Sequence, residues 1–319
     1  MKIVKLYPKI NSKFHFGYLG LDIDDIIFHS DSLFSTILIN YIRKYGDETV
    51  KEFVKNFPNI TSLFYGIKQG NSTVLFIPNI IGLTLPKELI DKDRKISKKI
   101  KFISIGYLKN IKSNNVRVNK SKNLIYLKDE GDEINLFYRD TEEKVCIDRK
   151  TLTVRKKKLN EGDKGSLYDV SYVRPLDNTF FYFLIDSDAI SNELEESIKL
   201  IELFGMGGEA SVGSGVIKEI EIDDFNEFDD MKGGNKFTNL SIVFPKSEEF
   251  DSIEKYKLIE RKGWIYLDTK RKSNILGIME GSIFNRKING ECKEDRGGGT
   301  INKIIYRYGK AFLIPVNEK

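Results

Sequence analysis

A run of glycines is the first stretch of this sequence whose residue types suggest binding chemistry. Gly205, Gly207, Gly208, Gly213 and Gly215 fall within eleven residues. Glycine opens backbone conformations that are closed to other residues, and it lets backbone N–H groups approach a bound group, often a phosphate. A helical pattern precedes the run and a strand-like pattern follows it. That order is the reverse of a dinucleotide-binding fingerprint, and no Gly-Lys-Ser/Thr sequence ends the run, so neither nucleotide motif is present.

The two histidines are the other candidates for chemistry. His15 and His29 could act as general acid or base in RNA cleavage, which needs an imidazole near a 2′-hydroxyl. His29 stands beside Ser30 and Asp31 at the expected start of a helix, where capping or an RNA contact is equally natural. His15 could simply pack in a turn. Catalysis and a structural role therefore both stay open.

Metal and disulfide chemistry find no support in the sequence. Cys146 and Cys292 have neither the number nor the spacing of a disulfide framework or a metal site. The carboxylates show no metal-ligand spacing on a well-defined strand. We therefore expect no metal and no cofactor.

The positive charge is concentrated in one part of the chain. The whole sequence carries +5, but residues 92–158 hold 20 Lys/Arg against 9 Asp/Glu. Such a concentration is the footprint of a polyanion partner, although a solvated lysine-rich surface would look the same. Within it, residues 109–122 carry five bases and no acid, which predicts a mobile or RNA-ordered loop. A second cluster, residues 219–230, has seven carboxylates and no base, and we interpret it as a linker.

A basic hairpin is expected inside the positive region. Residues 145–174 alternate in part and enclose a turn at residues 160–165, which is typical of two paired strands. Its bases include Arg149, Lys150, Arg155 and the run 156–158. They could add salt-dependent affinity for an RNA backbone, or they could mark an exposed edge that blocks strand pairing. The aromatic residues Phe14, Phe16 and Tyr18 could likewise stack on bases or belong to the core.

The composition is that of a globular protein. Hydrophobic residues make up 40% and charged residues 31% of the 319 residues. No apolar run approaches the roughly 20 residues that span a bilayer, and the first residues are too broken by Lys and Pro for a signal peptide. We expect a cytoplasmic protein with no membrane association.

The elements that would position these residues predict an α+β fold. Strands are expected at residues 2–10, 73–81, 179–185 and 216–222; helices are expected from Ser30 or Asp31 to Tyr45, over residues 47–57, and from Ser187 or Asp188 to Phe204. The resulting order is a ferredoxin-like (RRM-like) β-α-β-β-α-β domain over residues 1–225, with a basic insertion at about 86–165. A smaller β-rich domain over residues 235–319 is expected to be a degenerate second ferredoxin-like fold, which would make the arrangement tandem.

Four motifs resemble one protein family. Residues 29–34 (His-Ser-Asp-Ser-Leu-Phe), 147–151 (Ile-Asp-Arg-Lys-Thr), 165–168 (Gly-Ser-Leu-Tyr) and 306–312 (Tyr-Arg-Tyr-Gly-Lys-Ala-Phe) occur in that order along nearly the whole chain. Together with the helix–glycine loop–strand order, they resemble the RAMP superfamily of CRISPR systems. The match is to the Csm-family subunit that caps the 5′ end of the guide RNA (crRNA) in type III-A effector complexes.

The resemblance implies a non-catalytic role in RNA binding. Such a subunit holds the 5′ repeat-derived tag of the crRNA, docks to the large polymerase-like signalling subunit and contacts the backbone RAMP subunits, with its long hairpin acting as a thumb. The residues expected to contact RNA are His15, His29, Ser30, Asp31, Arg149, Lys150, Thr151, Arg155, Gly205, Gly207, Gly208, Ser211, Val212, Gly213 and Gly215.

The glycine loop departs from the family pattern. The relatives carry Lys-Arg-Ser after the paired glycines, whereas Glu209-Ala210-Ser211 stands here. A carboxylate beside phosphates lowers affinity, so RNA binding would depend on backbone N–H groups and Ser211. Two alternatives stay open: a metal-independent endoribonuclease that processes CRISPR repeat RNA, and a protein-interaction module without an RNA role.

Overall fold

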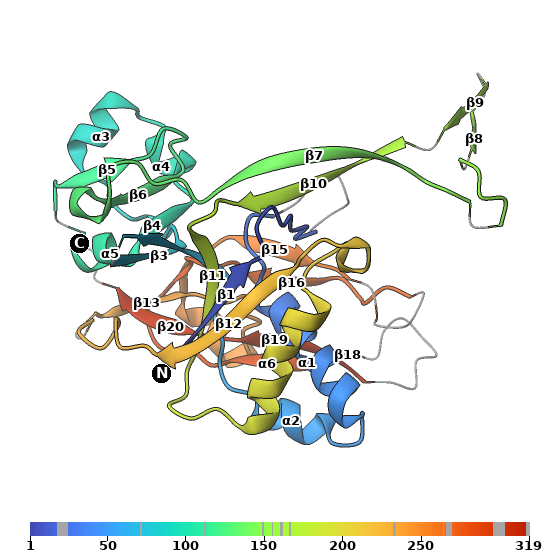
Figure 1. The fold of residues 1–319 in the computed structure, drawn as a ribbon. Helices are drawn as coiled ribbons and strands as arrows, with labels where there is room; N and C mark the ends of the chain where they lie inside the picture. Colours follow the sequence, from blue (N-terminus) through green and yellow to red (C-terminus); the bar gives the residue numbers. More distant parts are fainter. Residues whose placement is uncertain are drawn as a thin grey trace.

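An eight-stranded sheet forms the body of the protein. The computed structural model describes residues 1–17, 25–70, 72–111, 113–148, 150–154, 156–159, 162–165, 167–231, 234–263, 265, 270–295 and 304–316 (Figure 1). The strand order is β12-β1-β11-β2-β3-β4-β6-β5. The strands are β1 (Lys2–Pro8), β2 (Phe64–Gln69), β3 (Ser72–Pro78), β4 (Phe102–Ser104), β5 (Val116–Val118), β6 (Leu124–Leu127), β11 (Thr179–Ile185) and β12 (Ile217–Asp224).

Half of this sheet has a ferredoxin-like arrangement. The four strands β12-β1-β11-β2 pair antiparallel throughout, α1 (Ser30–Tyr45) lies between β1 and β2 in the chain, and α6 (Asn192–Phe204) lies between β11 and β12. That is the order of a β-α-β-β-α-β unit. Asn40 of α1 donates to the carbonyl of Ser197 in α6 at 3.2 Å, so the two helices pack together. The expected fold class, α+β, is confirmed.

The helix boundaries are close to those expected. Gly46 ends α1 as expected, and its N–H donates to the carbonyl of Ile42. The short helix α2 (Val50–Asn56) falls within the expected range 47–57. Helix α6, however, is capped by Ser191, whose Oγ accepts from the N–H of Leu194, and not by Ser187 or Asp188.

The second strand of the unit was assigned to the wrong residues. The expected strand at 73–81 is β3, whereas β2 pairs with β11. Gly66 interrupts the apolar pattern of β2. A larger residue has no room at this position, because a Cβ there would lie 2.3 Å from the ring of Phe180. Glycine in a strand often marks such a close approach, and it hides the strand from a pattern search.

The prediction of a mobile or RNA-ordered loop over residues 109–122 is wrong for the part of this range that forms α5 and β5. These residues include the end of α5 (Ile105–Lys109) and β5, which pairs with β6. Some of the bases already have acidic partners: Arg117 lies 3.0 Å from Asp132, and Lys122 lies 3.1 Å from Asp93. Between β3 and the next long strand, which begins at Phe137, the chain also forms α3 (Lys87–Lys92), α4 (Ile96–Lys99) and the 3-10 turn η1 (Lys128–Glu130).

A long hairpin projects from the body, but its strands differ from those expected. It consists of β7 (Phe137–Val145) and β10 (Leu167–Pro175), with the short pair β8 (Lys156–Leu159) and β9 (Gly162–Gly165) near its far end (Figure 1). The first strand therefore ends at Val145, where the sequence had suggested that it begins. Residues of β7 alternate between half-buried and exposed and are mostly charged, so they lack the apolar alternation that identifies a strand.

The acidic residues from 219 to 224 are not a linker. They lie in β12, at the edge of the large sheet, where Asp223 and Asp224 pair with Lys5 and Lys2 of β1 at 2.7 and 2.8 Å. The Tyr7 hydroxyl donates to Glu221 at 2.6 Å. Charged side chains on an edge strand also discourage pairing with other chains.

The C-terminal region is built from short strands. A four-stranded sheet has the order β14-β17-β13-β20, and two further pairs, β15–β16 and β18–β19, lie beside it. The elements are β13 (Lys236–Asn239), η3 (Ser247–Ser252), β14 (Ile253–Lys255), β15 (Leu258–Arg261), β16 (Ile275–Ile278), β17 (Ile283–Phe284), β18 (Gly290–Asp295), β19 (Ile305–Lys310) and β20 (Leu313–Val316). No α-helix occurs in the described residues of this region, so its likeness to a second ferredoxin-like fold stays a prediction.

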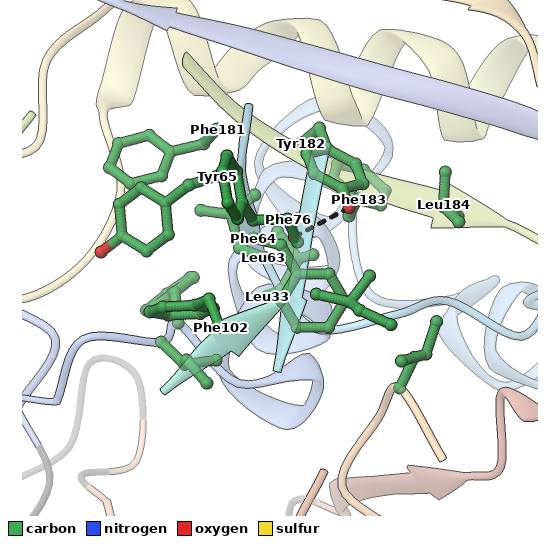
Figure 2. Close-up of a cluster of buried hydrophobic side chains, with 14 of the residues drawn as sticks. Leu33, Leu63, Phe64, Tyr65, Phe76, Phe102, Phe181, Tyr182, Phe183 and Leu184 are labelled. Carbon is green, nitrogen blue, oxygen red and sulfur yellow. Dashed lines mark hydrogen bonds between the residues drawn. The ribbon is translucent and has the colours of Figure 1, made fainter. Parts of the chain in front are cut away.

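One hydrophobic core joins the two regions. Aromatic residues of the large sheet fill its centre, and the Tyr182 hydroxyl donates to the carbonyl of Phe76 at 2.9 Å (Figure 2). Tyr308 of β19 stacks on Phe34 of α1, with ring centroids 5.0 Å apart, and accepts from the N–H of Ile60 at 2.7 Å. The C-terminal strands thus complete the core around α1, and the expected boundary between domains at residues 225–235 stays a prediction.

Two further expectations can be compared with the fold. Phe14 and Phe16 are buried and pack on Phe181, so they belong to the core and are not available to stack on bases; Tyr18 lies outside the described residues. No helix in the described part of the chain is long and apolar enough to cross a membrane.

Candidate nucleic-acid interface

The glycine loop, residues 205–216, connects α6 to β12. Gly205 ends α6 with φ of 69°, and its N–H donates to the carbonyl of Ile201. A 3-10 turn, η2 (Ala210–Val212), occupies the middle of the loop and is closed by Gly213 at φ of 90°. Ser211 and Val212 are exposed at this turn.

Most of the glycines serve the packing of the loop itself. A Cβ on Gly215 would lie 1.9 Å from the carbonyl oxygen of Met206, and one on Gly205 would lie 2.8 Å from the carbonyl oxygen of Gly215. On Gly207 and Gly208 a Cβ would meet His15, at 2.8 and 2.5 Å. The expected close approach therefore exists, but the approaching groups belong to the protein.

Many of the loop amides are also engaged internally. The N–H of Gly208 donates to the carbonyl of His15, and that of Gly215 to the carbonyl of Lys13, both at 2.8 Å. The amides of Met206, Val212, Gly213 and Ser214 donate within the loop. Among the described residues of the loop, the amides of Gly207, Glu209, Ala210, Ser211 and Val216 have no backbone partner. The first four lie at or beside the turn η2, and they are the donors that we expect the loop to offer to an anion.

A matched pair of glycine variants tests this view of the loop. We expect Gly215→Ala to destabilise the protein by about 2–3 kcal/mol, because it adds a clash with a backbone oxygen to the penalty of a positive φ. Gly213→Ala should cost only about 1–2 kcal/mol, since a Cβ there meets no atom within 4 Å. Urea unfolding of the full chain measures both. Equal losses would show that the conformation of the loop matters and its tight packing does not.

His15 lies where the glycine loop meets the hairpin. Its Nδ1 is 2.9 Å from the carbonyl oxygen of Ser171 on β10, and its ring lies edge-on to Tyr172. The side chain is buried, at 4% exposure. The sequence grouped His15 with the glycines as RNA contacts; the structure does bring them together, but with the imidazole facing protein.

A cluster of charges joins the root of the hairpin to the loop. Lys144 of β7 lies 2.6 Å from Glu209, and both side chains are about three-quarters buried. Lys13 lies over the Tyr172 ring at 4.4 Å and pairs with Glu142, which also accepts from Arg174 at 2.9 Å. Burial lowers the pKa of Lys144, but the hydrogen bonds and the charges of Glu209 and Tyr172 together outweigh burial and raise that pKa.

This cluster changes the expected effect of Glu209 on phosphate binding. The carboxylate is neutralised by Lys144 and is not free to repel a phosphate at the turn. Its backbone, at φ of 60°, sets up the exposed turn η2. Sequence reasoning missed Lys13, Lys144 and Tyr172, because their partners are distant in the chain; the only local signal was the unusual acid in the glycine run.

The predicted site residues at the start of α1 lie elsewhere, in the interior. His29, Ser30 and Asp31 are 2%, 0% and 8% exposed. Asp31 accepts two hydrogen bonds from Arg261 of β15, at 2.8 and 2.9 Å, and the Ser30 hydroxyl accepts from the N–H of Ile242 at 3.0 Å. These contacts tie α1 to the C-terminal region, so we leave the three residues out of the proposed RNA surface.

His29 is the centre of a second buried group. Its Nδ1 lies 2.8 Å from Glu280 and its Nε2 lies 2.9 Å from Asp25. Burial lowers the pKa of the imidazole, but the two carboxylates outweigh burial and raise the pKa to about 9. Conversely, His29 holds the pKa of Asp25 below its usual value against the effect of burial. Because both ring nitrogens already bind carboxylates, neither is left to accept a proton from RNA or to donate one to it.

Two of the remaining predicted residues, Lys150 and Thr151, lie at the hairpin tip. The backbone amides of Lys150 and Thr151 donate to the Asp148 carboxylate at 2.8 and 3.1 Å, and both side chains are exposed. Arg149 and Arg155 lie outside the described residues. No group of three or more potential metal ligands occurs in the part of the chain that the structure describes.

Comparisons with known proteins agree with this architecture. A family model described as the RAMP superfamily matches residues 42–218, and one described as the CRISPR Csm4 C-terminal domain matches residues 232–316. A Methanocaldococcus jannaschii protein described as CRISPR system Cms protein Csm4 is 35% identical over 378 aligned positions, covering 100% of this chain and 98% of that protein.

Solved structures have the same fold. The crystal structure of a Csm3–Csm4 subcomplex of the type III-A CRISPR–Cas interference complex contains a chain with a TM-score of 0.70 and 29% identity, covering 100% of both chains. A chain of a Csm1–Csm4 cassette in complex with pppApA gives 0.60 at 17% identity, covering 99% of this chain and 97% of that one.

The sheet, the glycine loop and the family match over residues 42–218 define a RAMP protein. Within that class, the full-length similarity and the match of the C-terminal region are more specific. The chain belongs to the Csm4 family of CRISPR proteins.

Proposed function

We propose that this chain is a non-catalytic RNA-binding subunit of a type III-A CRISPR (Csm) effector complex that holds the 5′ repeat-derived tag of the crRNA. The observation that carries the proposal is the convergence of the glycine loop, the His15 segment and the root of the hairpin at one place. Four free amides at an exposed turn lie there beside the base of a long ribbon whose far end is rich in lysine. Backbone amides bind phosphates and do not read bases. Such contacts suit a tag of constant sequence, because that sequence does not have to be recognised.

The proposed partners follow from the relatives. A family member forms a subcomplex with Csm3, and a chain with the same fold forms a cassette with Csm1. We propose corresponding contacts here with a backbone RAMP subunit and with the large polymerase-like signalling subunit. The hairpin is then the thumb that lies against the RNA, and Lys150 and Thr151 at its tip, together with Arg149 and Arg155, are proposed contacts.

Removal of the hairpin tip tests the RNA role. Val145 and Leu167 are register partners, so an Asn-Gly turn can join them in place of residues 146–166. This deletion removes seven bases and three acids. In filter binding of the full chain to repeat-tag RNA, we expect weaker binding. The salt dependence should also fall, by about 0.7 in log–log slope for each phosphate that the shortened hairpin no longer neutralises.

The control removes charge from another surface. Lys51 and Lys55 are exposed on α2, and their double serine variant should bind RNA as the wild type does. An unchanged slope after deletion of the tip would contradict the thumb assignment. No binding of the wild type at low salt, alone or with its partners, would favour a protein-interaction module.

Catalysis needs a separate test, since the proposal excludes it. Repeat RNA incubated with the protein in EDTA should stay intact. Site-specific cleavage that His15→Asn abolishes would overturn the proposal in favour of an endoribonuclease. His15 is the better variant because substitution of His29 would also break a buried cluster.

A further inference from the structure

A small cavity opens at the start of α1, between this helix and the C-terminal strands. Its volume is about 170 Å³. Ser32 and Ser35 line it from α1, Lys262 and Lys272 from the segments after β15 and before β16, and Arg307 from β19. None of these residues belongs to the glycine loop or to the hairpin, so the cavity is a separate feature.

The lining carries more positive than negative charge. Lys262, Lys272 and Arg307 line the cavity together with a single acid, Asp31. Lys262 also pairs with Glu260, which is not part of the lining, at 2.9 Å. Both oxygens of Asp31 already accept from Arg261, which leaves this carboxylate unable to neutralise the other cations. The nearest carboxylate oxygen to Arg307 is that of Asp295, at 3.4 Å, which is long for a charge-assisted bond.

Lys272 is a cation of the lining for which the described residues supply no direct ion pair, although Asp31 and Asp295 act on it from a greater distance and raise its pKa. Its ammonium approaches the Ser35 hydroxyl at 3.5 Å, and among the described residues it forms no ion pair within 4.0 Å. Burial and the neighbouring Arg307 lower its pKa to about 8. The side chain of Lys272 is partly buried, and a charge that has lost part of its hydration is normally paired, because nothing else compensates for the loss. An anion in the cavity would supply the missing partner.

The other polar groups suit an oxyanion. The Ser32 hydroxyl accepts from Arg261 at 2.8 Å, which leaves its own proton free to donate. The N-terminus of the 16-residue helix α1 adds a favourable partial charge. The size is also informative, since sites for drug-sized ligands occupy roughly 300–1,000 Å³. The cavity can hold a phosphate group but not a whole nucleotide.

We propose that this cavity binds a phosphate group, held by Lys272, Arg307 and Lys262 with the Ser32 hydroxyl. The group is either a free phosphate ion or one phosphate of a bound RNA, and the chemistry of recognition is the same for both. The site does not depend on RNA binding by the glycine loop.

The test compares three versions of the full chain in thermal unfolding. Inorganic phosphate should raise the Tm of the wild type, by about 4 °C at a hundredfold excess over Kd. Lys272→Met should abolish this rise and, without phosphate, should melt at the same temperature as the wild type or higher, because it removes an uncompensated cation. Lys218→Met, which removes an exposed lysine on β12, should respond to phosphate as the wild type does.

Binding of repeat-tag RNA separates the two sources. If RNA supplies the phosphate, Lys272→Met weakens RNA binding more than Lys218→Met does, and inorganic phosphate competes with RNA. If free phosphate is the ligand, only the Tm responds. A phosphate effect that persists in Lys272→Met overturns the site, and so does the absence of both effects. Either result leaves the proposed function of the hairpin and glycine loop intact, because that function is tested by the tip deletion.

Discussion

Replacement of Arg261 by methionine should lower the free energy of unfolding by about 3–5 kcal/mol. The guanidinium makes two hydrogen bonds to Asp31, and the two side chains are only 5% and 9% exposed. Removal of the cation leaves a carboxylate buried without its partner, which is the costly way to break a buried pair. Urea unfolding of the full chain, followed by circular dichroism, measures the loss.

The chain offers a control in an exposed arginine–aspartate pair that also has two hydrogen bonds. Arg286 also makes two hydrogen bonds to one carboxylate, that of Asp251, but these side chains are 51% and 71% exposed. Arg286→Met should cost at most about 1 kcal/mol, because water and salt screen an exposed pair. Equal losses for the two variants would show that burial does not determine the energetics of the Asp31 pair.

A double variant separates the charge from the packing. Arg261→Met combined with Asp31→Leu removes both charges, and apolar replacement of a buried pair is often neutral or stabilising. We therefore expect the double variant to be more stable than Arg261→Met alone. A double variant as unstable as the sum of two single losses would contradict the assignment of the cost to an unpaired charge.

The second large effect concerns pH. Glu280 and Asp25 raise the pKa of His29 from 6.5 to about 9, which corresponds to about 3 kcal/mol. Because the folded-state pKa lies above the unfolded one, this stability is fully present below pH 6.5 and is lost as the pH rises through 9. Asp25 has the opposite sign: its pKa is lowered, so its contribution is present above its usual value of 3.8 and is lost in acid.

His29→Gln should remove this dependence on alkaline pH. Urea unfolding at pH 6 and at pH 10 should show the wild type losing about 3 kcal/mol more than the variant. His15→Gln is the matched control, since the chain has only two histidines and this variant keeps His29. For the same reason, NMR titration of the ring protons can assign the pKa directly. An imidazole that titrates at or below 6.5 would show that the carboxylates do not hold the charged form.

The local elements of this protein could be predicted from its sequence. The apolar spacing of α1 and α6, the glycines that end both helices and the continuous apolar run of β11 depend on neighbours within a few residues. The family could also be recognised, because its motifs are short and occur in a constant order. The glycine loop could also be identified, because five glycines within eleven residues are a local departure from average composition.

The roles of the polar residues were decided by contacts across the fold. His29 and Asp31 meet Glu280 and Arg261, which lie more than 200 residues away in the chain. The residues next to 29–31 do not predict those partners, so the sequence is equally consistent with a motif that is exposed to RNA. The strands of the hairpin were misplaced because β7 is charged on both faces and is identified only by its pairing with β10.

The glycine loop shows most clearly which properties depend on the sequence alone and which depend on the tertiary structure. By itself the sequence determined that the chain must turn tightly between α6 and β12, because only glycine tolerates the positive φ values at Gly205, Gly207, Gly213 and Gly215 without strain. What the loop packs against was decided by the tertiary structure. His15 takes the space at Gly207 and Gly208, and the carbonyls of His15 and Lys13 accept from the amides of Gly208 and Gly215. Lys144 pairs with the Glu209 carboxylate, and one exposed turn remains with its free amides. Backbone conformation is a local property of the residue type, whereas the availability of a donor depends on every segment that folds against it.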